Sequence, residues 1–139
     1  MAQLATKKAL TLAAAKQIAA AAEAEAAKNN WNVVIAVLDD GANLVYLQRM
    51  DGTQIGSIDV AQQKGACAIR FKRPSKVFAD LVNSGSPGMM SLRGVVPVEG
   101  GLPLTVDGQI IGAIGVSGVK SDQDGIVAKA GADVAASLS

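Results

Sequence analysis

The segment Leu104-Thr-Val-Asp-Gly-Gln-Ile-Ile-Gly-Ala-Ile-Gly-Val-Ser117 carries the strongest fold signal in the chain. Asp107-Gly108 between two apolar runs is among the clearest local signals of a β-hairpin. Residues 109–117 are a long apolar run and are predicted to form a buried strand. The segment therefore predicts an antiparallel sheet rather than a doubly wound nucleotide-binding fold.

Gly112, Gly115 and Gly118 fall in or just after this strand and superficially resemble a phosphate-binding loop. They lack the G-x-G-x-x-G spacing, and no Gly-Lys-Ser/Thr follows them. We interpret them as positions where a helix or a neighbouring subunit approaches the strand closely.

Earlier in the chain, a second hairpin is predicted from two apolar runs joined by the turn residues Asp39–Asn43. Alanine-rich periodicity, capping residues and Pro74 predict helices on either side of the hairpins. Thr11 is the predicted N-cap of the first helix, and Ser121 with Asp124 forms a predicted variant capping box for the last. The expected helices cover about 12–28, 57–71, 75–83 and 121–136, and the expected strands 32–38, 44–50, 95–97, 100–106 and 109–117.

This order of elements predicts an α/β protein of the α+β type. Its centre would be an antiparallel sheet of about five strands with helices packed on it. The chain has 139 residues, and no linker or internal repeat divides it, so we expect one domain over residues 1–139.

Composition excludes several classes of partner. A net charge of +1 gives no long-range electrostatic field that would attract a nucleic-acid backbone. The short basic run at residues 70–76 is interpreted as a solvated helix end. No apolar stretch approaches the roughly 20 residues needed to span a bilayer. The single cysteine, Cys67, excludes an intrachain disulfide and suits a reducing compartment, so a cytoplasmic location is expected.

The chain contains no histidine, which removes the usual general base at neutral pH and the commonest ligand of zinc and haem iron. A Ser-His-Asp triad is therefore impossible. Cys67 lies on the apolar face of its predicted helix and is expected to be a buried structural thiol. The acidic pair Asp39-Asp40 is expected in a turn, so no dedicated metal site is predicted.

Four charged residues remain as candidates for chemistry: Arg49, Lys64, Arg93 and Glu99. They lie at element ends or in glycine-rich loops, where a pocket could form beside the sheet. An arginine next to the glycine-rich backbone of Gly100-Gly101 suits a carboxylate-bearing ligand, because a guanidinium and free amides can share its oxygens. Ordinary surface charge is the alternative, and the sequence leaves both open.

Several segments, taken in order, resemble the GlcG/HbpS-like family, which includes the C-terminal domain of PduO-type proteins. The resemblance extends almost from end to end. It rests on Val34–Gly41, Arg49–Gly52, Ser57–Ala61 with Lys64, Phe71–Ser75, Gly100–Leu104, and Gly108–Gly118 with Gln123-Asp124.

This resemblance implies a profilin-like fold and compact homo-oligomers, commonly octamers. Characterised relatives include proteins that bind haem or corrinoids, so haem is the cofactor that the resemblance implies. Where a relative uses histidine as the tetrapyrrole ligand, this chain has none to take that role.

The first functional hypothesis is therefore a homo-oligomeric small-molecule-binding protein for haem or another planar carboxylated ligand. Arg49 and Arg93 would meet carboxylates, and Gly100-Gly101 would line the approach. The second is a cofactor-independent lyase or isomerase that acts on a small carboxylated metabolite of a catabolic pathway, such as an aromatic acid. Arg49 or Arg93 would position the substrate, with Glu99 as acid or base and Lys64 as a secondary candidate. The third is a structural or accessory subunit.

Overall fold

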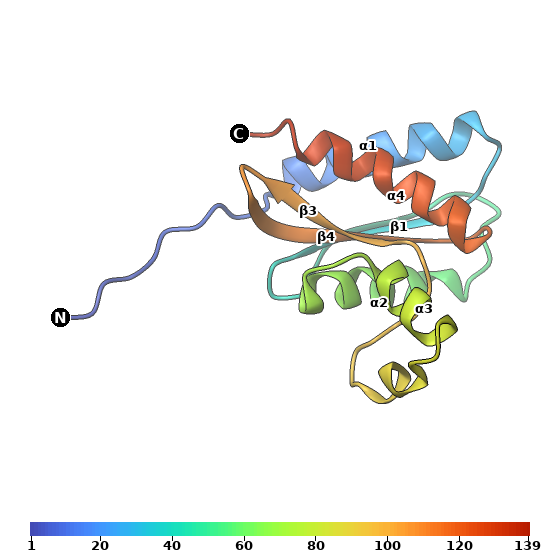
Figure 1. Cartoon of the computed structure of the whole chain (residues 1–139). Helices are drawn as coiled ribbons and strands as arrows, with labels where there is room; N and C mark the ends of the chain where they lie inside the picture. The colour runs from blue at the N-terminus through green and yellow to red at the C-terminus, as the bar shows by residue number, and fades with distance from the viewer.

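The computed structural model describes residues 1–139 and contains one antiparallel sheet in the strand order β2-β1-β4-β3. Helices α1 and α4 cover one face of the sheet and α2 covers the other (Figure 1). The elements are α1 Leu12–Lys28, β1 Val34–Asp39, β2 Leu44–Arg49, α2 Ser57–Phe71, α3 Ser75–Asn83, the 3-10 turn η1 Pro87–Ser91, β3 Gly101–Val106, β4 Gln109–Ser117 and α4 Ser121–Ala135.

The α+β class and the antiparallel sheet are as predicted, but the sheet has four strands instead of about five. Residues 95–97 form no strand. The N–H of Val96 donates to Sγ of Cys67 over 3.3 Å, so this segment is tied to α2. Pro97 has no N–H to donate to a ladder.

Most predicted helix ends agree with the structure, because local signals mark them: Pro74 separates α2 from α3, and a side-chain cap starts α1. Oγ1 of Thr11 accepts the N–H of Ala14 over 3.1 Å at the start of α1. The capping box predicted from Ser121 and Asp124 is wrong. Helix α4 instead begins after Lys120, whose N–H donates to Gln123.

The larger core fills the layer between the sheet and helices α1 and α4. Ala15, Ile18, Ala19, Ala22 and Ala26 form the buried face of α1. Four of these five residues are alanines, so the helix can lie close to its neighbours despite the low aromatic content. No helix in the structure is long and apolar enough to cross a membrane.

On the opposite face, α2 lies directly on β4. A Cβ on Gly115 would overlap the carbonyl oxygen of Ala61 and the amide nitrogen of Gly65. The interpretation of Gly115 as a site of close helix approach is therefore confirmed. This contact fixes the position of the helical turn from residue 61 to residue 65, which carries Lys64.

Candidate functional site

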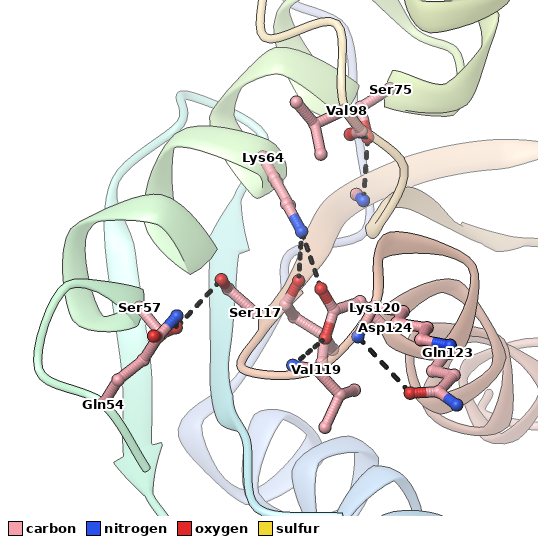
Figure 2. Close-up of polar contacts among 12 residues, drawn as sticks. Gln54, Ser57, Lys64, Ser75, Val98, Ser117, Val119, Lys120, Gln123 and Asp124 are labelled. Atoms are coloured by element: carbon pink, nitrogen blue, oxygen red, sulfur yellow. Dashed lines mark hydrogen bonds and ion pairs between the residues drawn. The ribbon is translucent and has the colours of Figure 1, made fainter.

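A buried ion pair joins α2 to α4. Nζ of Lys64 lies 2.9 Å from Oδ2 of Asp124 and 3.1 Å from the carbonyl oxygen of Val116. Oδ1 of Asp124 accepts the N–H of Val119 over 3.2 Å, so both carboxylate oxygens are bonded (Figure 2). Burial raises the pKa of Asp124, while the contact with Lys64 acts in the opposite direction.

The backbone of Gly100 and Gly101 lies against Lys64. Gly100 has a φ of +134°, and a Cβ there would come within 2.9 Å of Nζ of Lys64 and 2.6 Å of the Val116 oxygen. A Cβ on Gly101 would overlap the Lys64 carbonyl. Only glycine permits this approach, because it lacks the Cβ and accepts the positive φ at position 100.

Gly101 is also held by α3. Its N–H donates to Oγ of Ser75 over 2.9 Å, and Ser75 donates to the carbonyl oxygen of Val98 over 2.6 Å. The first residue of α3 thus fixes the entry into β3. Residues 98–101 are consequently bound from two sides, by α3 and by Lys64.

A groove of about 470 Å³ runs along β3, which is an edge strand of the sheet. We call it the β3 groove; it is bounded by α4 and by the start of α3. Pro103 lies within its strand wall, where a residue without an N–H is tolerated because the edge has no partner strand. The groove is lined by Pro74, Lys76, residues 99–103, Thr105, Gly125, Lys129, Ala132 and Asp133.

Charged groups line the rim of the β3 groove. Lys76 and Lys129 form exposed ion pairs of 2.8 Å with Asp80 and Asp133, each within its own helix. The hydrogen bond to Asp80 raises the pKa of Lys76. Exposed pairs contribute little stability, so either ammonium can exchange its partner for a ligand carboxylate.

Glu99 lies over the first turns of α4. A Cβ on Gly125 would come within 2.9 Å of the Glu99 Cδ, so the glycine leaves room for this carboxylate. The Glu99 side chain is half-buried at the groove. The absent side chain at position 125 therefore decides where this negative charge lies.

The structure brings together some of the residues singled out from sequence. Glu99, Gly100 and Gly101 line the β3 groove, and Lys64 lies beneath Gly100. Arg49, at the end of β2, is exposed on the opposite edge of the sheet. Arg93 is exposed in the loop before β3, and neither arginine lines any of the four cavities.

Sequence reasoning missed three residues of this region. Lys76 was interpreted as part of a solvated basic run, and Asp124 as a cap. Lys129 was not considered, although its spacing of four from Gly125 places both on one face of α4. No local pattern could reveal Asp124 as the partner of Lys64, because the two lie 60 residues apart.

The prediction that Cys67 is a buried thiol is confirmed, since the side chain is fully buried. Burial raises its pKa. Its Sγ accepts the Val96 N–H, so it serves to hold the segment before β3. No group of three or more His, Cys, Asp or Glu side chains is placed to hold a metal ion.

Comparison with known proteins identifies the family. The model of the family described as "Haem degrading protein HbpS-like" matches residues 10–133. The chain belongs to the HbpS-like family. Protein GlcG of Escherichia coli K12 is 44% identical to this HbpS-like chain over 112 residues. The alignment covers 81% of this chain and 84% of GlcG.

Two solved structures resemble the HbpS-like chain closely. Klebsiella pneumoniae protein ORFY has a TM-score of 0.91 and 34% identity, covering 100% of this chain and 99% of ORFY. A structure described as a PduOC:heme complex has a TM-score of 0.83 and 29% identity, covering 91% of this chain and 95% of that one. The agreement with ORFY extends over the whole fold, including the elements around the β3 groove.

Proposed function

We propose that this HbpS-like protein binds a planar tetrapyrrole with two carboxylates, of which haem is the type, in the β3 groove. The observation that carries the proposal is the pair of lysines, Lys76 and Lys129, on a groove floored by glycine backbone. A relative of the same fold is known as a complex with haem. A volume of about 470 Å³ is within the usual range of small-molecule sites.

The groove residues fit the outer parts of such a ligand. Leu102, Pro103 and Ala132 offer an apolar wall for one face of a macrocycle, and the glycine backbone allows close approach. Lys76 and Lys129, on different helices, could each meet one carboxylate. Both ammonium groups are already at the rim, where a carboxylate can stay partly hydrated.

The groove offers the iron only weak ligands. Its lining contains no histidine, cysteine, methionine or tyrosine, so the carboxylates of Glu99 and Asp133 are the only charged oxygen ligands that it offers. When bound, haem would supply its iron and its spectrum, while this chain would bind the macrocycle and its carboxylates. We therefore expect iron to add little to the affinity.

The test is a titration of the protein with haemin and with iron-free protoporphyrin. Binding is monitored by absorbance and by quenching of the Trp31 fluorescence. Both ligands should bind with affinities within about tenfold of each other. The double variant Lys76→Gln/Lys129→Gln should weaken both by about ten- to a hundredfold, since each exposed charged contact contributes about 1 kcal/mol.

Lys16→Gln serves as the control, because Lys16 is an exposed lysine of α1 outside all four cavities. Its affinities should match those of the unaltered protein. Unchanged porphyrin binding in the double lysine variant, or no binding by the unaltered protein, would contradict the proposal.

Self-association is part of the same proposal. Leu12, Ile55 and Ile126 are large apolar side chains that are about half exposed or more, which favours burial against another copy. Such a copy would be needed to bring Arg49 or Arg93 to a groove. Native mass spectrometry should give a homo-oligomer, and a strictly monomeric protein at micromolar concentration would contradict this part.

A further inference from the structure

A second cavity of about 480 Å³ lies against α2 and shares no lining residue with the β3 groove. Three separate segments form it: a face of α2, the β1–β2 hairpin, and residues 94–96. Leu38, Leu44, Ala66 and Val95 give it an apolar floor. We call it the Arg70 groove, after the single charged residue that lines it.

The charge of Arg70 is not compensated. No carboxylate lies within 4.0 Å of its guanidinium, and no aspartate or glutamate lines the groove. The lysines of the β3 groove, in contrast, have aspartate partners. The Arg70 groove therefore presents one unpaired cation beside an apolar surface.

The local backbone is arranged around this guanidinium. Gly94 has a φ of +87°, and a Cβ there would come within 3.3 Å of Nη1 of Arg70. Gln62 donates to the carbonyl oxygen of Ile58 over 3.1 Å, which holds one side-chain amide at the groove wall. The exposed amide of Gln63 lies one residue further on and adds a donor at the rim.

We propose that the Arg70 groove is a second binding site, for a small organic monocarboxylate with an apolar body. A planar guanidinium can bind the carboxylate through two parallel hydrogen bonds, and the apolar floor can cover the body of the ligand. One cation without an acidic neighbour matches one negative charge. This site is independent of tetrapyrrole binding in the β3 groove.

Benzoate and its uncharged isostere benzamide are the probes, and amide chemical shifts of the isotope-labelled full chain are the readout. Benzoate should shift the resonances of Gly94, Val95 and the Arg70 Nε–H saturably. Benzamide should bind about tenfold more weakly, because it lacks the charge-assisted contact. Arg70→Gln should lower the benzoate affinity to that of benzamide, while Lys16→Gln should leave it unchanged.

Haemin titration separates this site from the first one. Arg70→Gln should leave porphyrin binding unchanged, and the double lysine variant should retain benzoate binding. Equal affinity for benzoate and benzamide would overturn the proposal. So would benzoate shifts confined to the β3 groove, or benzoate binding that Arg70→Gln does not weaken.

Discussion

Nζ of Lys64 lies 2.9 Å from Oδ2 of Asp124, in a place where each side chain is only 2% exposed. This contact joins the middle of α2 to the first turn of α4 across the end of β4. The Gly100 backbone rests on the same lysine. The pair therefore fixes the inner end of the β3 groove, although neither side chain lines that groove.

Breaking the pair on one side should be costly. Lys64→Met leaves the Asp124 carboxylate buried without its cation, and we expect a loss of about 3–5 kcal/mol in the free energy of unfolding. Urea denaturation measures it. The double variant Lys64→Met/Asp124→Leu should recover most of this loss, since a buried pair can be replaced by apolar residues at little cost. A single variant as stable as the unaltered protein would refute this account.

The close contact of α2 with β4 predicts a difference between two glycine variants. Gly115→Ala should destabilise the protein by more than about 3 kcal/mol, because its Cβ would overlap backbone atoms that cannot move independently. Gly56→Ala is the matched control, because position 56 has a φ of −58° and no heavy atom within 4 Å of the added Cβ. Thermal unfolding should give a clearly lower melting temperature for Gly115→Ala than for Gly56→Ala. Similar melting temperatures would count against close packing of α2 on β4.

Cys67 predicts a pH dependence above neutrality. Burial raises its pKa above the ordinary value of 9.0, so the unfolded chain releases the thiol proton at a lower pH than the folded one. Its contribution to stability is fully present below pH 9.0 and is lost as the pH rises through the folded pKa.

Urea unfolding at pH 8 and pH 10 should therefore show a smaller loss of stability in Cys67→Ala than in the unaltered protein. The comparison cancels the titration of lysines, which both chains share. Alkylation of Cys67 at pH 8 should also be slow in the folded state. Fast alkylation without unfolding would show that the thiol is accessible.

Glu99 predicts an effect of charge on ligand binding. Under the proposed function, Glu99→Gln should tighten protoporphyrin binding by roughly two- to tenfold, because it removes a like charge near two carboxylates. The gain should shrink at high salt. Weaker binding in this variant would instead assign Glu99 a direct contact with the ligand.

Gly125→Ala, a substitution in α4, tests whether the position of the Glu99 carboxylate matters for ligand binding. The added Cβ would displace Glu99, while alanine raises the helix propensity of α4 by about 1 kcal/mol. We expect a change in porphyrin affinity without a loss of stability. A variant that binds porphyrin with unchanged affinity would indicate that the position of Glu99 is irrelevant to the site.

Local signals in the sequence were sufficient for most of the elements. Thr11 caps α1, Pro74 separates α2 from α3, and Asp107-Gly108 turns between β3 and β4, because each acts through its own backbone and immediate neighbours. The extra strand at residues 95–97 was predicted wrongly, since only the packed structure shows that Val96 bonds to Cys67 on α2.

By itself the sequence determined the α+β class, the helix and hairpin boundaries, and the absence of imidazole chemistry. Short-range periodicity and composition encode all of these. Tertiary structure alone decided that Glu99 and Gly100 share a groove with Lys129, and that Lys64 is neutralised by Asp124. These contacts join residues tens of positions apart, and their geometry depends on how close the helices lie to the sheet.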